Sequence, residues 1–160
     1  MALPLRILGN QLLHSQQFKQ ILKSLHLTKH IIFLYTSINT TAAIMSRELI
    51  SSEKFPPKPH NSPATKIPGL VFCAGQTATG EIKQATRKVL QNLKEVLELS
   101  GSSLDKVVKY NVYLADMKDF AAMNEVYIDF LPQPMPSRSC LQAVPPGDGT
   151  VIEIECIAQA

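Results

Sequence analysis

The chain has few histidines and few cysteines, and both shortages limit the kinds of metal site, catalytic triad and disulfide that it can form. Of the four histidines, only His60 lies beyond residue 30. A histidine-based metal site or a Ser-His-Asp triad is therefore nearly excluded from the rest of the sequence. The three cysteines, Cys73, Cys140 and Cys156, lie in apolar strand-like segments without CxxC spacing. That pattern argues against a disulfide framework or a zinc site and indicates a reducing compartment.

Tryptophan and long apolar runs are also absent. The run Ile31–Tyr35 is far shorter than the roughly 20 residues that a transmembrane helix needs. We therefore expect no membrane partner. The length of 160 residues and the apolar content of 45% suit one soluble globular domain with an ordinary core.

Acidic residues are missing from residues 1–47, which carry five basic residues. The remaining chain holds 11 basic and 13 acidic residues, a net charge of −2. The basic character of the protein therefore belongs to its N-terminal segment. The rest has no electrostatic footprint for nucleic acid, so a nucleic-acid partner is not expected.

Residues 1–44 have the character of an N-terminal extension. Apolar residues fall on one helical face, with basic residues elsewhere: Phe18, Ile21, Leu22 and Leu25. This is typical of a mitochondrial presequence, although such peptides favour arginine and only Arg6 precedes Arg47. Alternatively, Met45 is the true start. In either case we assign residues 1–44 to the extension and 45–160 to the folded domain.

Strands and helices alternate through the domain. We expect strands at 47–50, 70–74, 108–114, 139–144 and 151–158. We expect helices at 82–99 and at 120–130, the second capped by Asp119. The five prolines of residues 55–68 indicate a loop or extended arm, and Gly75 is expected to end its strand. The order β-β-α-β-α-β-β predicts an α+β fold, a mixed sheet with both helices on one face. The other face still carries apolar side chains, which predicts oligomerisation.

Two charges lie in apolar, strand-like stretches near the C-terminus. Arg138 stands in Pro-Ser-Arg-Ser-Cys, and Glu153 in Val-Ile-Glu-Ile-Glu. An arginine fork suits a substrate carboxylate, and a glutamate can orient or deprotonate a water. Together they would form a pocket for a small anion with hydrolysis at its far end. The alternative, which the pattern alone favours, is a structural ion pair across adjacent strands. Cys140, two residues after Arg138, would share its face.

Several motifs in order resemble the Rid/YjgF family of reactive-intermediate (enamine/imine) deaminases, and the resemblance spans the whole predicted domain. They are Leu-Val-Phe-Cys-Ala-Gly-Gln at 70–76, Gln-Asn-Leu-Lys at 91–94, Asp-Met-Lys-Asp-Phe at 116–120, Asn-Glu-Val-Tyr at 124–127, and the two stretches around Arg138 and Glu153. The resemblance implies a chorismate-mutase-like fold and a homotrimer with a cleft at each subunit interface. It further implies hydrolysis of 2-aminoacrylate, 2-aminocrotonate and related 2-imino acids to 2-keto acids and ammonia, with no cofactor and no metal.

The resemblance also assigns roles. Arg138 would clamp the substrate carboxylate, and Glu153 would handle the attacking water; these are the expected catalytic residues. The expected substrate-binding positions are Arg138, Cys140, Gly75, Gln76, Asn124 and Asn61. Glu155 should share the face of Glu153, and we assign it a structural role. With the resemblance included, Arg138 is favoured as a carboxylate ligand over a structural pair.

The chain departs from the family pattern in two places. Asn61 stands where relatives usually carry a pocket-lining tyrosine. The stretch 77–81 is about ten residues shorter than in relatives. These departures would permit a non-catalytic ligand-binding or protein-stabilising trimer. An endoribonuclease or translation inhibitor is a further alternative, an activity ascribed to some members of the family, although the net charge and the lack of histidine argue against it. The extension fits a mitochondrial, fungal-type member, so we expect the protein in the mitochondrial matrix or the cytoplasm.

Overall fold

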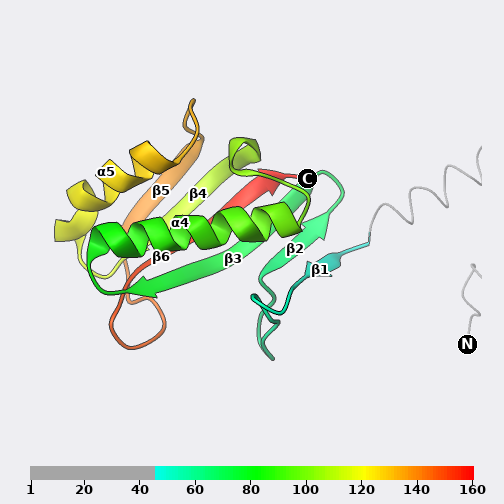
Figure 1. The fold of residues 1–160 in the computed structure, drawn as a ribbon, viewed down its shortest axis with the longest axis horizontal. Helices are drawn as coiled ribbons and strands as arrows, with labels where there is room; N and C mark the ends of the chain where they lie inside the picture. Colours follow the sequence, from blue (N-terminus) through cyan, green and yellow to red (C-terminus); the bar gives the residue numbers. More distant parts are fainter. Residues whose placement is uncertain (1–45) are drawn as a thin grey trace, which may run out of the picture. The chain divides into compact units, whose positions relative to one another are not determined.

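The computed structural model describes residues 46–160; the extension predicted at 1–44 lies outside the described residues. The described chain forms one six-stranded sheet in the order β1-β2-β3-β6-β4-β5 (Figure 1). All neighbouring strands are antiparallel except β4 and β5, which run parallel. The strands are β1 (Glu48–Ile50), β2 (Ala64–Ile67), β3 (Leu70–Thr79), β4 (Val107–Leu114), β5 (Ser137–Gln142) and β6 (Thr150–Gln159).

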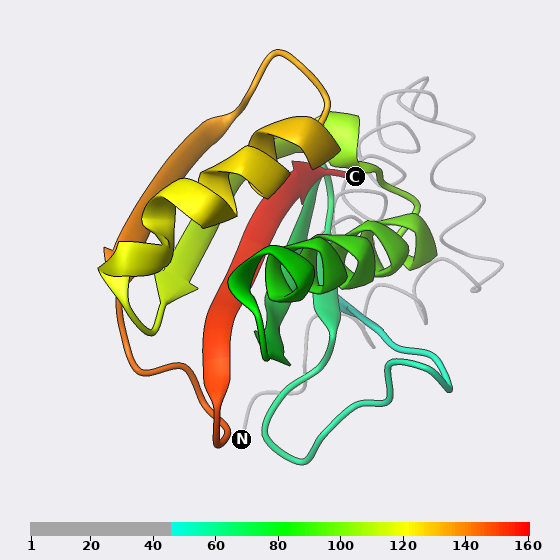
Figure 2. The same cartoon turned by 60° about the vertical axis from the view of Figure 1, so that its left-hand side comes forward.

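Two helices cover one face of this sheet. Helix α4 (Ile82–Leu99) follows β3, and α5 (Phe120–Phe130) connects the parallel strands β4 and β5. Figure 2 shows both helices on the same side of the sheet. Short 3₁₀ turns, η1 (Leu104–Lys106) and η2 (Met117–Asp119), precede β4 and α5. The predicted mixed sheet with two helices on one face is confirmed.

The Pro-rich arm contains a strand that the sequence analysis missed. Ala64–Ile67 lies between Pro63 and Pro68 and forms β2, which pairs with both β1 and β3. None of these four residues is a proline, so their backbone N–H groups can donate hydrogen bonds to β1 and β3. The flanking prolines mark the two ends of the strand and do not prevent it. The prediction of a loop or extended arm through 55–68 therefore missed the strand at these four residues, and the sheet has six strands instead of the five expected.

Two local predictions also need correction. Gly75 does not end its strand, because β3 continues to Thr79 with an irregularity in its pairing to β6 between Cys73 and Gln76. Asp119 occupies the N-cap of α5 but its side chain makes no capping hydrogen bond. Asp116 instead accepts a hydrogen bond from the backbone N–H of Lys118 and so caps η2.

The core lies between the sheet and α4. Helix α4 buries one stripe of side chains, as its 3.6-residue periodicity predicts: Ile82, Ala85, Thr86, Val89, Leu90, Leu93, Val96 and Leu97. Alternate residues of the central strands are buried on the helix-bearing face of the sheet: Tyr110, Val112 and Leu114 from β4, and Ile152, Ile154, Cys156 and Ala158 from β6. None of the helices in residues 46–160 is long and apolar enough to cross a membrane.

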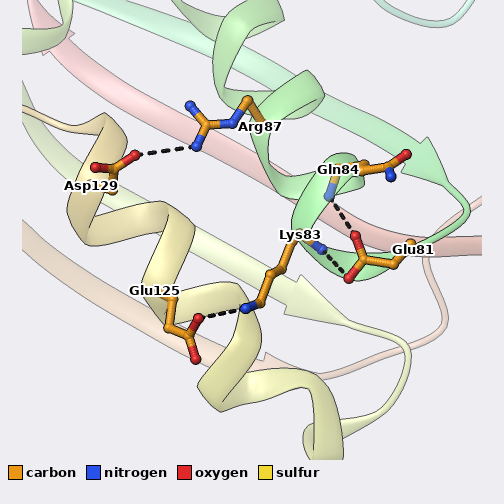
Figure 3. Close-up of polar contacts among 6 residues, drawn as sticks. All are labelled: Glu81, Lys83, Gln84, Arg87, Glu125 and Asp129. Atoms are coloured by element: carbon orange, nitrogen blue, oxygen red, sulfur yellow. Dashed lines mark hydrogen bonds and ion pairs between the residues drawn. The ribbon is translucent and has the colours of Figure 1, made fainter.

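Polar contacts order the outer surface of the two helices (Figure 3). Glu81 caps α4 by accepting hydrogen bonds from the backbone N–H groups of Lys83 and Gln84. Lys83 pairs with Glu125 at 2.6 Å and Arg87 with Asp129 at 3.2 Å, which ties α4 to α5. These pairs are solvent-exposed, so they contribute little to stability.

Candidate functional site

Arg138 lies on the helix-bearing face of the sheet. Strand β5 places it opposite Tyr110, whose side chain is fully buried in the core. Its Nη1 atom donates a hydrogen bond of 2.6 Å to Oδ1 of Asn124 on α5. Among residues 46–160 no carboxylate pairs with Arg138. The guanidinium is therefore held in place but keeps its charge available for an anion.

Aromatic rings support the same guanidinium. Its central carbon lies 4.7 Å from the ring centre of Tyr127 and 5.6 Å from that of Phe120, both within cation–π range. In the sequence these rings stood out only as parts of the motifs at 116–120 and 124–127. Their spacing in the sequence could have indicated a shared binding partner, because Phe120, Asn124 and Tyr127 lie on one helical face. That face positions the arginine through both stacking and a hydrogen bond.

Cys140 shares the face of Arg138, as predicted. It lies opposite Val112 of β4 and is half-buried. Burial raises the pKa of the Cys140 thiol, and the nearby positive charge of Arg138 only partly opposes this effect. The thiol is therefore neutral at physiological pH, which fits a pocket wall better than a nucleophile.

Glu153 lies on the opposite, helix-free face. In β6 its neighbours Ile152 and Ile154 are fully buried against the helices, so the alternation of a strand directs Glu153 away from them. In addition, β5 pairs with β4 and not with β6. The alternative of an ion pair between Arg138 and Glu153 across adjacent strands is therefore wrong, and one subunit does not bring the two groups together.

The surroundings of Glu153 favour its protonated form. Burial raises the pKa of the Glu153 carboxyl, and the negative charge of Glu155 raises it further. Glu155, on the same face as predicted, accepts hydrogen bonds of 2.9 Å from Asn111 Nδ2 and Tyr113 Oη. No residue of the described chain donates a hydrogen bond to the side-chain carboxyl of Glu153. A half-buried carboxyl with a raised pKa and no partner suits proton transfer.

Gly75 makes room for this carboxylate. A Cβ atom built on Gly75 would lie 1.8 Å from Oε1 of Glu153, a distance that no side chain tolerates. The glycine inside β3 is therefore explained by the close approach of Glu153 from the adjacent strand β6. The next residue, Gln76, donates from Nε2 to the carbonyl oxygen of Ala74 at 3.3 Å.

A pocket of about 320 Å³ opens beside Gly75 and Gln76. The Pro-rich arm, the central part of β3 and Asn92 of α4 line it. Asn61 is among the lining residues, so the structure places Asn61, Gly75 and Gln76 together. No group of histidine, cysteine, aspartate or glutamate residues in the described part of the chain is arranged to hold a metal ion.

The predicted site residues thus form two separate groups. We call Arg138, Asn124 and Cys140 the arginine half-site, and Glu153, Gly75, Gln76 and Asn61 the glutamate half-site. The first lies on β5 and α5, and the second on β6, β3 and the arm. A small substrate that touches both Arg138 and Glu153 needs a second copy of the chain, because these two side chains lie on opposite faces of the sheet in one subunit.

The sequence of the described domain matches the family model "Endoribonuclease L-PSP" over residues 52–160. The chain belongs to the Rid/YjgF/L-PSP family. Among its curated relatives is the mitochondrial protein mmf2 of Schizosaccharomyces pombe, 47% identical over 71% of this chain and 98% of the relative. The mitochondrial protein mmf1 of the same yeast is 40% identical over 96% of this chain and 98% of the relative.

A named deaminase and a solved structure add to this Rid assignment. Reactive Intermediate Deaminase A of Arabidopsis thaliana is 36% identical, over 78% of this chain and 72% of the relative. The crystal structure of yeast Mmf1 superposes with a TM-score of 0.66 at 35% identity, over 71% of this chain and 98% of that chain. The Rid fold predicted from the motifs is therefore confirmed.

Substituting Gly75 tests the contact with Glu153. We expect Gly75→Ala to lower the free energy of unfolding by about 1–3 kcal/mol, because the new methyl group displaces the Glu153 carboxylate. In a Glu153→Ala background the same substitution should cost little, since the colliding atoms are gone. Urea unfolding of the wild type, both single variants and the double variant measures this coupling. An equal cost of Gly75→Ala in both backgrounds contradicts the proposed contact.

Proposed function

We propose that the protein hydrolyses reactive 2-imino (2-enamino) acids, such as those derived from 2-aminoacrylate and 2-aminocrotonate, to 2-keto acids and ammonia. The observation that carries the proposal is the pair of unneutralised groups, a rigidly held arginine and a glutamate with a raised pKa. The name of the Arabidopsis relative, a reactive-intermediate deaminase, supports the same reaction.

The separation of the half-sites indicates that the active site forms between subunits. A contact that joins two different patches of identical chains is heterologous, and such contacts form a ring when the rotation between subunits closes. We propose a homotrimer, the assembly that the family resemblance implies. The helix-free face would be covered in it, and this face carries the half-exposed side chains of Phe72 and Leu141. Covering such apolar side chains favours association.

In the proposed reaction, Arg138 of one subunit binds the substrate carboxylate through its free N–H groups. The protonated imine carbon is already electrophilic. Glu153 of the neighbouring subunit removes a proton from a water as the water oxygen bonds to this carbon, which gives a carbinolamine. Glu153 then returns the proton to the amino nitrogen. The C–N bond breaks as the hydroxyl oxygen forms the carbonyl, and ammonia and the 2-keto acid are released once the remaining proton is lost to solvent.

The remaining residues have supporting roles in this proposal. Asn124 and the rings of Phe120 and Tyr127 hold the guanidinium in one orientation, so that less rotational freedom is lost when the carboxylate binds. Gly75 lets the Glu153 carboxylate approach β3, where the pocket begins. The neutral thiol of Cys140 closes the wall beside Arg138. An RNA-cleaving activity gains no support from the charge of residues 48–160, whose net value is −2.

Mixing two inactive variants tests both the chemistry and the shared site. We expect Arg138→Ala and Glu153→Ala each to lose imine turnover. Equal amounts refolded together should regain about a quarter of wild-type activity, because about one interface in four would pair an intact arginine with an intact glutamate. Turnover is followed by the decrease in semicarbazone formed from an imine that a threonine dehydratase releases.

Two controls make the result decisive. Each variant refolded alone, and Arg138→Ala refolded with the doubly substituted chain, should stay inactive. An active wild type with no recovery in the mixture would contradict a site between subunits. A wild type that forms folded oligomers but does not compete with semicarbazide would refute the deaminase and favour a ligand-binding role.

The pH dependence of turnover reports the state of Glu153. The carboxylate form is the base, and its pKa is raised above the ordinary value of 4.5, so activity should fall with a midpoint above 4.5 as the pH decreases. Glu155→Gln removes the neighbouring negative charge and should move this midpoint to lower pH. Glu98→Gln, on the exposed side of α4, serves as the matched control. The measurement is kcat/KM from pH 4 to 8, and an unmoved midpoint in Glu155→Gln contradicts the assignment.

We also propose import into mitochondria. The match to mmf1 extends over 96% of this chain and therefore includes most of residues 1–44, and that relative is mitochondrial by name. A fluorescent protein fused after residue 44 should enter mitochondria in yeast, and one fused to the chain starting at Met45 should stay in the cytosol. Equal cytosolic distribution of the two fusions would refute import.

A further inference from the structure

The pocket beside Gly75 differs in character from what an alkyl side chain would need. Three amide side chains line it, those of Asn61, Gln76 and Asn92. Lys54 and Lys58 add two cations, and no carboxylate is among its lining residues. Phe55 is the one aromatic side chain in the wall. Amides and cations without an acid are suited to an anionic, hydrogen-bonding group.

One of the two cations is free to act on a ligand. Lys54 is already engaged, because its Nζ atom pairs with Glu95 of α4. Lys58 makes no ion pair with any residue of 46–160. The positive charge that the pocket offers therefore comes from Lys58.

The backbone holds Lys58 and Asn61 on the same side of the arm. The two residues form an isolated antiparallel bridge, in which the N–H of Lys58 donates to the oxygen of Asn61 at 2.8 Å and the reverse bond is 3.2 Å. Residues directly opposite each other in an antiparallel pair project to the same face. The turn 58–61 thus presents one cation and one amide to the pocket together.

This pocket adjoins the proposed reaction centre. Gly75 is both a lining residue and the point where the Glu153 carboxylate touches β3. The imine carbon must lie within reach of a water on Glu153, and the substrate side chain begins one bond from that carbon. A side chain that extends past Gly75 would enter this pocket, whose volume of about 320 Å³ is at the lower end of small-molecule sites.

We propose that the pocket selects imines whose side chain carries a carboxylate, the 2-imino derivatives of acidic amino acids, with Lys58 as the specificity-determining residue. The inference rests on the proposed function, because it assigns the side-chain end of the same site. Lys58 would bind the distal carboxylate, while Asn61, Gln76 and Asn92 donate hydrogen bonds around it. An alkyl side chain would leave these polar groups without partners, which costs binding energy.

Competing imines test the preference. An L-glutamate oxidase generates 2-iminoglutarate, a threonine dehydratase generates 2-iminobutanoate, and semicarbazide traps what the full-length protein does not hydrolyse. We expect kcat/KM to favour 2-iminoglutarate by about tenfold, the usual effect of one hydrogen bond to a charged group. Lys58→Met should bring the ratio close to one. Lys88→Met, an exposed lysine on α4 outside this pocket, should leave the ratio at its wild-type value.

Equilibrium binding separates the failure of this inference from the failure of the deaminase. Calorimetry would compare 2-oxoglutarate with 2-oxobutanoate on the wild type and on Lys58→Met. Turnover of both imines without a preference, or a preference that survives Lys58→Met, overturns the role of the pocket and leaves the deaminase standing. Absent turnover with tighter, Lys58-dependent binding of 2-oxoglutarate upholds the pocket and refutes the deaminase. Absent turnover without that binding preference overturns both.

Discussion

The alternation of side chains along β6 is the constraint on which the rest of the molecule depends. This strand lies between β3 and β4 in the middle of the sheet, and its even-numbered residues from Ile152 to Ala158 are buried under the helices. A shift of one residue would move the whole apolar set to the other face, so the register is strongly determined. The same alternation fixes Glu153 and Glu155 on the helix-free face. One strand therefore positions both the core residues and the candidate base, and a change in the register of β6 would displace both.

Maintaining that base has an energetic cost. The folded-state pKa of Glu153 is raised, so folding penalises its ionised form. The stabilisation associated with the protonated group is complete below the unfolded-state pKa and is lost as the pH rises through the higher folded-state value. At neutral pH the domain therefore carries a destabilised carboxylate. The large apolar core between α4 and the sheet provides the stability that tolerates it, as is common at functional sites.

The sequence was a good guide wherever one element's own pattern decides the structure. The helix at 82–99 and the strands at 108–114 and 151–158 have clear periodicities, and the structure has α4, β4 and β6 there. The predictions failed where the structure of a segment depends on residues elsewhere in the chain. Gly75 looked like a strand end because its reason, the Glu153 carboxylate, is 78 residues away. Proline marked the arm as irregular, although β1 and β3 supply partners for four of its residues.

For the candidate site, the motifs named residues but not their arrangement. The motifs brought out Arg138, Glu153, Gly75 and Asn61, whereas the strand order that separates them follows from the whole topology. Strands β5 and β6 are consecutive in sequence, yet β4 lies between them in the sheet. The support of Arg138 by Phe120 and Tyr127 was hidden for a related reason. From the sequence alone, large aromatic residues on a helix could equally belong to the core or support a functional side chain. Only the position of β5 shows that they contact Arg138.

The arm that carries Lys58 and Asn61 contributes little to the buried core. Its own backbone bridge joins Lys58 to Asn61, and it contacts the domain through the Lys54–Glu95 pair and the bond from the Ala74 N–H to the Pro63 carbonyl. The fully buried residues belong mainly to the central strands and the helices. Substitutions in the arm can thus change the pocket wall without repacking the core or moving Glu153. Under the proposed function, such a division would let selectivity change while the reactive groups stay fixed. Residues 54–61 would then be the segment to randomise in a search for altered imine selectivity.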